Sequence, residues 1–143
     1  MSARVFCHSH RVSYAECTVG NHVYYARYLD LLEEARGEFF RQLGRPLRDL
    51  QAEDLIFPVV AARLRYHAAA RYDDQLTIEV RVTLVRRVRL NLAHRILNAA
   101  GRLLVEAEIE HVCTNTADQP QRLPAELEAR LQPYVAAASA DEQ

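Results

Sequence analysis

The stretch VSYAECTVGNHVYYARYLDLLEEAR, from Val12 to Arg36, decides the fold, because its second half has the period of an amphipathic helix. Apolar residues recur there at positions i, i+3, i+4, i+7 and i+11, which are Tyr28, Leu31, Leu32, Ala35 and Phe39. Gly44 and then Pro46 predict the end of this helix. The first half gathers small, polar and titratable residues directly before the helix, which makes it a candidate site.

Most of the remaining chain alternates between apolar and polar residues, as strands with one buried face do. We predict strands in residues 4–14, after Pro58, and in residues 76–84, 90–96 and 105–113. VRRVR and NAAGR predict turns between the later strands, and a short helix is expected after Pro124. This order predicts an α+β fold in which the long helix packs against an antiparallel sheet. We assign residues 1–136 to one domain and residues 137–143 to a frayed C-terminal tail.

The composition predicts one domain of a cytoplasmic protein. A chain of 143 residues is long enough to bury a core of its own. Its net charge of -1 gives no general attraction to nucleic acid, and no run approaches the ~20 apolar residues of a membrane span. The N-terminus has no apolar signal segment. Three cysteines without regular spacing do not predict a disulfide framework, so we expect reduced thiols.

Cysteine and histidine residues near the N-terminus offer two kinds of chemistry. CHSH together with Cys17 could form a zinc site, but in a strand Cys7 points away from His8 and His10, which disfavours convergence. Cys17 could also be a nucleophile with His22 or His10 as its base. A small, partly buried thiol is the simpler interpretation of Cys17.

Two charged pairs have open interpretations. Glu33 and Glu34 fit a solvated helix face, although a carboxylate beside a cleft could act as a base. Of the two, Glu33 is favoured for a half-buried site, because it directly follows the apolar Leu32. Arg86 and Arg87 belong to the only basic cluster of the chain. They could be ordinary surface residues or could bind phosphate, which suits the guanidinium group.

The quoted stretch resembles the 4-hydroxybenzoyl-CoA thioesterase family of hotdog-fold proteins. Members carry a segment like Y-x-D-T-D-x-x-G-x-V-Y-H-A-N-Y-L, followed by E-x-A-R in the helix. The matching positions are Tyr14, Val23, Tyr24, Ala26, Tyr28, Leu29, Glu33, Ala35 and Arg36. Three later segments also follow the family pattern in order: RYHAAARYDDQLTIEV, LLVEAEIEHVCTN and RLPAEL. The resemblance implies a single hotdog domain, in which a curved antiparallel sheet wraps around a long central helix.

The chain departs from the family pattern at the site itself. Thr18 stands where the family has its catalytic aspartate, the second of D-T-D, and a threonine cannot supply a carboxylate. Glu16 and Cys17 replace the first two residues of that motif, Asn21 replaces its glycine, and Tyr25 stands before the alanine. Relatives without the aspartate exist among thioesterases that act on carrier-protein-bound polyketides. They resemble this chain in having Glu at the first position and an amide at the second.

The resemblance implies a site at the N-terminus of the long helix. There the backbone N–H of Tyr25 would donate to the thioester oxyanion, helped by the helix dipole. Thr18 would position the attacking water, and Glu16 or Glu33 would be the base. Glu16 is two residues from Thr18, which puts both on one side of an extended segment. Contacts to the rest of the substrate are expected from Tyr24, Asn21, His22, Arg86 and Arg87, of which the arginines would meet the coenzyme A phosphates.

These expectations lead to a thioesterase that hydrolyses acyl-CoA or acyl-carrier-protein thioesters. It would need no metal or other cofactor, since coenzyme A is part of the substrate. A hotdog protein that binds acyl-CoA without turnover is the alternative, and a purely structural assembly protein is a third. Because a curved sheet around one helix leaves a strand edge open, we expect a homodimer or a homotetramer.

Overall fold

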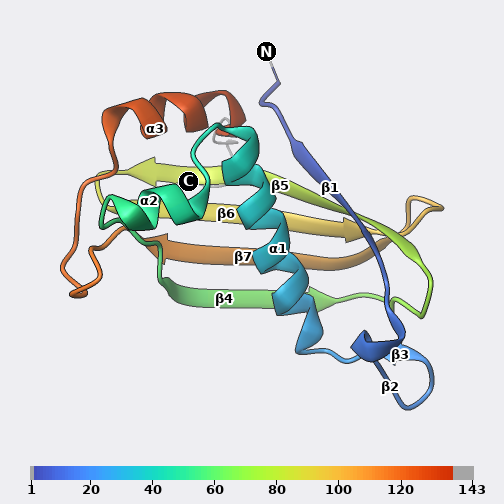
Figure 1. Ribbon diagram of the computed structural model, residues 1–143. Coiled ribbons are helices and arrows are strands. Elements are labelled where there is room, and N and C mark those ends of the chain that lie inside the picture. Colours follow the sequence, from blue (N-terminus) through green and yellow to red (C-terminus); the bar gives the residue numbers. More distant parts are fainter. Residues whose placement is uncertain (1, 137–143) are drawn as a thin grey trace.

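The computed structural model describes residues 2–136, so the tail predicted at residues 137–143 lies outside the described residues. One helix, α1 (Arg27–Gln42), packs across a five-stranded antiparallel sheet with the strand order β1-β5-β6-β7-β4 (Figure 1). The strand bounds are β1 (Phe6–Arg11), β4 (Val59–Tyr66), β5 (Gln75–Arg86), β6 (Arg89–Leu97) and β7 (Leu103–Val112). The predicted α+β fold is therefore confirmed.

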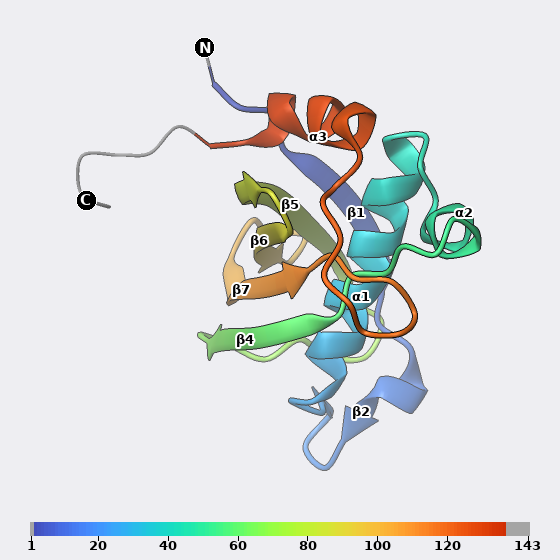
Figure 2. The same ribbon diagram turned by 90° about the vertical axis from the view of Figure 1, so that its left-hand side faces the viewer.

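Helix α1 buries the apolar face that its period predicts. The six buried residues of the helix are Tyr28, Leu31, Leu32, Ala35, Phe39 and Phe40. Gly44 follows the helix with a φ of 79°, a left-handed conformation that favours glycine. Figure 2 shows that the sheet curves around one side of α1, with β1 and β4 at its two ends.

The core lies between α1 and the alternating inward residues of β5, β6 and β7. Fully buried positions on these strands include Leu76, Ile78, Val80, Val82, Leu90, Leu92, Ile96 and Val105. Burying each of these side chains contributes roughly 1.5–3 kcal/mol, so the sheet face and the helix face stabilise one another. The two histidines on the same inward faces, His94 and His111, are also buried.

Short elements around this core were not all predicted. Helix α2 (Leu47–Ala52) and the two-stranded sheet of β2 (Cys17–Thr18) and β3 (His22–Val23) are additional, whereas α3 (Ala125–Leu131) confirms the helix expected after Pro124. The first strand ends at Arg11 rather than at residue 14. A 3₁₀ turn, η1 (Tyr14–Glu16), follows because Ser13 and Glu16 form a reciprocal capping box.

Within residues 2–136, strand β4 has a partner strand on only one of its sides. It pairs with β7 and lies at the end of the sheet, and seven of its eight residues are exposed. Val59 and Val60 are 47% and 56% exposed, which is high for two adjacent β-branched residues on a strand. An apolar, unpaired edge of this kind is suited to pairing with another strand.

Candidate active site

The segment predicted to react is a small hairpin at the foot of α1. In it Cys17 pairs with Val23 and Thr18 pairs with His22. Asn21 has a φ of 61°, which asparagine tolerates better than most residues, and its side-chain oxygen accepts a hydrogen bond of 3.2 Å from the Tyr72 backbone N–H. Asn21 therefore fixes the hairpin to the segment before β5.

Thr18 is exposed and lines an open hollow. The other residues that line this hollow come from the hairpin and its neighbours: Tyr14, Cys17, Val19, Gly20, Asn21 and Tyr72. The Thr18 hydroxyl is thus accessible to water and to a ligand. His22, opposite Thr18, is exposed on β3, the strand of the hairpin that also forms a bridge with Arg71.

Glu16 is held by hydrogen bonds rather than being free. Its carboxylate accepts bonds from the Ser13 backbone N–H at 2.7 Å and the Ser13 hydroxyl at 3.0 Å, and it lies 2.9 Å from Nε2 of His10. Burial alone would raise the pKa of Glu16, but the hydrogen bonds from Ser13 and His10 outweigh burial and keep the pKa below its usual value. The expectation that Glu16 and Thr18 share an extended segment is wrong, because Glu16 ends the η1 turn.

The histidines of β1 bind carboxylates from two other elements. His8 Nε2 lies 2.7 Å and His10 Nδ1 lies 3.1 Å from the same oxygen of Glu34 on α1, while His10 reaches Glu16 with its other nitrogen. This network ties β1, the reacting segment and α1 together. Within residues 2–136 no group of three or more His, Cys, Asp or Glu side chains is arranged to hold a metal ion.

Neither cysteine near the site has the features of a nucleophile. Burial, together with the negative charges of Glu16 and Asp74, raises the pKa of the Cys17 thiol. The Cys17 sulfur lies 3.7 Å from the Ser13 carbonyl oxygen, so the thiol donates to the backbone rather than to a histidine. Cys7 is exposed on the other side of β1 from His8 and His10, as the alternation of a strand requires.

The backbone N–H of Tyr25 is available at the start of α1. The Tyr24 N–H donates to the Glu16 carbonyl at 3.0 Å and the Arg27 N–H donates to the Tyr24 carbonyl at 2.8 Å, whereas the Ala26 N–H has no acceptor within the described residues. Within the described residues the Tyr25 N–H has no hydrogen-bond acceptor. A free donor at a helix N-terminus, where the helix dipole adds its field, stabilises negative charge on an oxygen atom.

Aromatic side chains lie close to Tyr25. The Tyr66 hydroxyl donates to the Tyr25 carbonyl at 3.1 Å, and the rings of Tyr24 and Tyr25 are 4.8 Å apart. Tyr28 packs on Tyr66 at 5.5 Å, and its hydroxyl accepts a bond of 3.0 Å from the Ala70 N–H. Tyr24, Tyr25 and Tyr66 keep about half of their surface exposed, so they offer an aromatic wall to a ligand.

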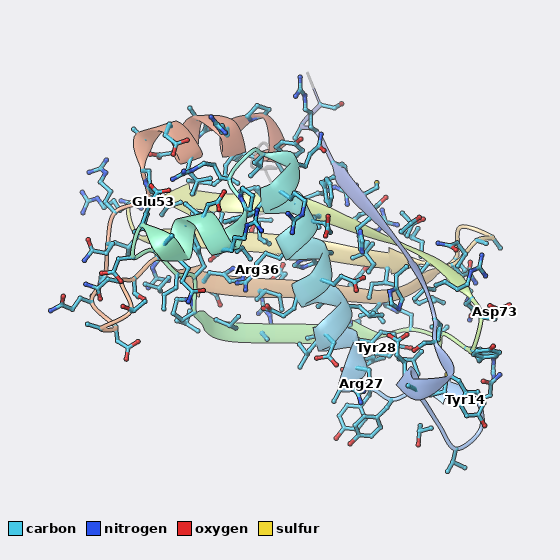
Figure 3. All side chains as sticks on the ribbon, viewed as in Figure 1. Tyr14, Arg27, Tyr28, Arg36, Glu53 and Asp73 are labelled. Atoms are coloured by element: carbon cyan, nitrogen blue, oxygen red, sulfur yellow. The ribbon has the colours of Figure 1, made fainter. Side chains whose placement is uncertain are left out.

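A cavity of about 250 Å³ lies farther along α1, between the helix and the sheet. Its lining residues are Leu29, Leu32, Glu33, Arg36, Val59, Ala62, His94, Ile109 and His111. Glu33 forms an ion pair of 2.9 Å with Arg36, and another guanidinium nitrogen of Arg36 donates to the Phe57 carbonyl at 2.9 Å. Figure 3 shows Arg36 beside the middle of α1, over the sheet, with Tyr28 and Arg27 at the N-terminal end of the helix.

Arg86 and Arg87 lie far from the hairpin of their own chain. They are at the turn between β5 and β6, as predicted, but the hairpin touches the segment just before the other end of β5, where His22 forms a bridge with Arg71. Along β5 from Gln75 to Arg86 the distance is roughly 36 Å at 3.3 Å per residue. Figure 1 shows the β5–β6 turn and the β2–β3 hairpin at opposite sides of the molecule. One chain alone therefore does not bring the arginines to Thr18 and Tyr25.

The curved sheet, its central helix and the polar hairpin at the helix N-terminus define a hotdog-type domain. Residues 12–131 match the thioesterase-like superfamily. The chain is 35% identical over 132 residues to the acyl-CoA thioester hydrolase YbgC of Escherichia coli O6:H1, a similarity that covers 92% of this chain and 98% of that protein. The chain belongs to the thioesterase-like superfamily, and the family resemblance of its motifs is confirmed.

Solved structures share the same architecture. A probable thioesterase from Bartonella henselae is 30% identical to this chain and matches it with a TM-score of 0.80. The match covers 85% of this chain and 100% of that one. The dynemicin thioesterase reaches a TM-score of 0.88 at 21% identity, covering 94% of this chain and 100% of that one, and thereby supports the fold. No helix in the described part of the chain is long and apolar enough to cross a membrane.

Proposed function

We propose that this protein hydrolyses acyl-CoA thioesters at the N-terminus of α1. The relative from Escherichia coli carries this activity in its name, as does the acyl-CoA thioesterase YbgC of Haemophilus influenzae, which is 31% identical over 121 residues. The observation that carries the proposal is the free backbone N–H of Tyr25 beside the exposed Thr18 hairpin and the aromatic wall. This arrangement suits a reaction in which negative charge develops on a carbonyl oxygen.

The proposed reaction needs only water as a co-reactant. The water oxygen attacks the thioester carbon, and the Tyr25 N–H donates to the oxyanion that forms. The tetrahedral intermediate then collapses, the C–S bond breaks, and the proton taken from water ends on the released thiolate. Since this scheme uses no redox or Lewis-acid step, we propose no metal or cofactor beyond the coenzyme A of the substrate.

Thr18 is the residue we assign to the attacking water. Its hydroxyl is accessible and lies on the hairpin that precedes Tyr25. Glu16 is the nearer carboxylate, although Ser13 and His10 already occupy its oxygens. Glu33 comes eight residues after Tyr25, roughly 12 Å along the helix, and lines the cavity between α1 and the sheet rather than the oxyanion site. We propose that Glu16 positions the reacting segment through its hydrogen bonds to Ser13 and His10. When the hydrogen bond to His10 breaks, Glu16 can instead accept the proton of the attacking water.

The test is release of free thiol from a panel of acyl-CoA substrates, with matched variants at Thr18. Thr18→Val keeps the shape but removes the hydroxyl, so kcat should fall by about 10²-fold or more. Thr18→Ser keeps the hydroxyl and should retain most of the activity. Equal activity of the valine and serine variants would contradict the role of the hydroxyl. The same panel presented on an acyl-carrier protein decides between the two carriers by kcat/KM.

Binding of acyl-CoA without turnover is the second candidate function. The replacement of the family aspartate by Thr18 favours it, and so do the hydrogen bonds that occupy Glu16. In this case acyl-CoA would raise the melting temperature of the protein while no thiol is released. Thiol release that depends on the Thr18 hydroxyl would rule it out.

We also propose that the active form is at least a homodimer and acts in the cytoplasm. The exposed edge of β4 supports pairing of two chains, and the distance between Arg86–Arg87 and the hairpin supports a site that uses arginines from a second chain. The three cysteines are free in the structure, which fits a reducing compartment. In this arrangement Tyr24 and His22 would contact the substrate beside the hairpin, whereas Asn21 would act by holding the hairpin.

A further inference from the structure

Two histidines of β1 and two glutamates form a continuous network beside the reacting segment. His8 Nε2 lies 2.7 Å and His10 Nδ1 lies 3.1 Å from Oε2 of Glu34, and His10 Nε2 lies 2.9 and 3.0 Å from the two carboxylate oxygens of Glu16. His10 thus stands between two carboxylates that belong to different elements, α1 and η1. The proposed hydrolysis gives no role to His8 or to Glu34.

The number of protons in this network follows from its geometry. An ionised carboxylate only accepts hydrogen bonds, so each of the three histidine–glutamate contacts needs a proton on the imidazole nitrogen. A neutral imidazole carries one proton, so two neutral rings supply only two. The network with all three contacts therefore holds one additional proton. Because imidazole is a stronger base than a carboxylate, this proton lies on His10, the ring that contacts a carboxylate with both of its nitrogens.

The surroundings of His10 contain no other group that takes the place of these partners. The side chains of His10 and Glu16 are 17% and 15% exposed, so their contact is largely shielded from water. The residues of β5 that pair with His10 and His8 are the apolar Leu76 and Ile78. The other titratable groups on the neighbouring elements are Cys17 after η1, Asp74 before β5, and on α1 Asp30 and Glu38, which are paired with Arg27 and Arg41. Within the described residues His10 is therefore bonded to two carboxylates and to no cation.

Glu16 connects His10 to the oxyanion donor. Its side chain contacts His10, and its backbone carbonyl accepts a hydrogen bond of 3.0 Å from the Tyr24 N–H. The Tyr24 carbonyl accepts a bond of 2.8 Å from the Arg27 N–H, and it shares one planar peptide group with the free N–H of Tyr25. Tyr24 is thus held on one side by Glu16 and on the other by the first turn of α1. The orientation of the Tyr25 N–H depends on both of these contacts.

We infer that His10 and Glu34 are positioning residues for the hydrolysis, because the doubly protonated ring of His10 joins α1 to Glu16 and thereby holds the Tyr25 N–H toward the oxyanion. The inference rests on the proposed function, since it takes this N–H to be the oxyanion donor. When the additional proton leaves, His10 can donate to only one of its two carboxylates. The contact with Glu34 is the one that is lost, since Glu34 is 44% exposed, lies at the longer distance and keeps a bond from His8. The reacting segment then loses its link through His10 to α1, and kcat falls.

The experiment compares the pH dependence of kcat, from about pH 5.5 to pH 9, in the wild-type chain and in Glu34→Gln. An amide at this position donates to His10 Nδ1, so the contacts form without the additional proton. The wild-type kcat divided by that of Glu34→Gln should therefore fall about 3- to 10-fold as the network loses its proton, with a smaller change in KM. This ratio cancels the pH dependence of the thioester chemistry itself. Glu38→Gln removes the same charge one helical turn away without touching His10, and it should keep the wild-type profile.

Ring protonation is measured directly by ¹⁵N NMR of the histidine side chains, with His10→Gln used to assign the signal. His10 should carry two protons in the wild-type chain at the pH of highest kcat relative to Glu34→Gln, and one proton in that variant.

Parallel pH profiles of the wild-type chain and Glu34→Gln would overturn the inference, as would a Glu38→Gln profile that matches Glu34→Gln. A wild-type kcat that rises relative to Glu34→Gln as the proton leaves would also overturn it, because Glu16 would then act as a base that His10 releases. If no acyl-CoA is hydrolysed at all, the proposed function is refuted, and the ring protonation still decides the network. Two protonated nitrogens on His10 would support the proton count, and a single one would overturn it.

Discussion

Acidification from pH 7 to about 4.5 should destabilise the fold through its two buried histidines. His94 and His111 lie on β6 and β7, and the positive charge of Arg36 on α1 acts on both rings. Their folded-state pKa values are about 3 and about 4, whereas both have an ordinary value of 6.5. Between pH 6.5 and 4.5 the unfolded chain therefore binds protons that the folded chain does not, so stability falls as the pH falls.

The size of the effect follows from this difference in bound protons. Each ring lowers the free energy of unfolding by about 1.4 kcal/mol per pH unit in this window, or by about 3 kcal/mol at pH 4.5. Two rings together would remove a large part of the roughly 5–15 kcal/mol that stabilises an ordinary domain. Glu16 adds to the fall only at the acidic end of this window, because the unfolded carboxyl begins to bind a proton near its ordinary value of 4.5 while the folded carboxyl, with its lowered pKa, does not.

Urea unfolding followed by circular dichroism at pH 7, 6, 5 and 4.5 measures this slope. His94→Leu removes one of the two rings, so the variant should lose about 1.4 kcal/mol per pH unit less than the wild-type chain. The comparison cancels the exposed histidines, which both chains share. A wild-type stability that stays level from pH 6.5 to 4.5, or a variant with an unchanged slope, would refute the assignment of these rings as neutral and buried.

Three further changes probe the site and the assembly. Replacing both Arg86 and Arg87 by alanine should raise KM for acyl-CoA with a smaller effect on kcat, and added salt should have the same effect on the wild-type chain. Unchanged kinetics would mean that the two arginines are ordinary surface residues. Thr18→Asp supplies the carboxylate of the family and should speed hydrolysis of simple acyl-CoAs by about 10²-fold or more, whereas slower turnover in a folded variant would show that a carboxylate at this position cannot replace the threonine hydroxyl. Val60→Lys places a charge on the β4 edge and should convert a dimer into a monomer in sedimentation experiments, which a wild-type monomer at micromolar concentration would contradict.

The parts of the fold that follow a single repeating pattern could be predicted from the sequence. The apolar face of α1 could be predicted from the 3.6-residue period alone. The β5–β6 turn could be predicted because it lies between two runs of alternating apolar and polar residues. The β2–β3 hairpin was not predicted, because strands of two residues have no measurable period and the turn depends on the left-handed conformation of Asn21.

The polar lining of the cavity was beyond sequence reasoning for a different reason. His94 occupies an inward position of β6 between Leu92 and Ile96, so it resembles any residue of a buried strand face. In the sequence, Arg36 is only the last residue of the family's E-x-A-R motif, and His111 is one of the residues of the strand predicted at 105–113. Their importance arises only when α1, β6 and β7 meet at one cavity, and that contact joins residues up to 75 positions apart, from Arg36 to His111.

The separation between the β5–β6 turn and the hairpin also has a genetic consequence. If the arginines of one chain bind the substrate whose thioester lies in another chain, then no single polypeptide carries a whole active site. Each site is then built from two copies of the gene product. Two impaired alleles, one damaged at Arg86 and Arg87 and the other at Thr18, would then complement each other, because a mixed assembly contains one site in which both halves are intact.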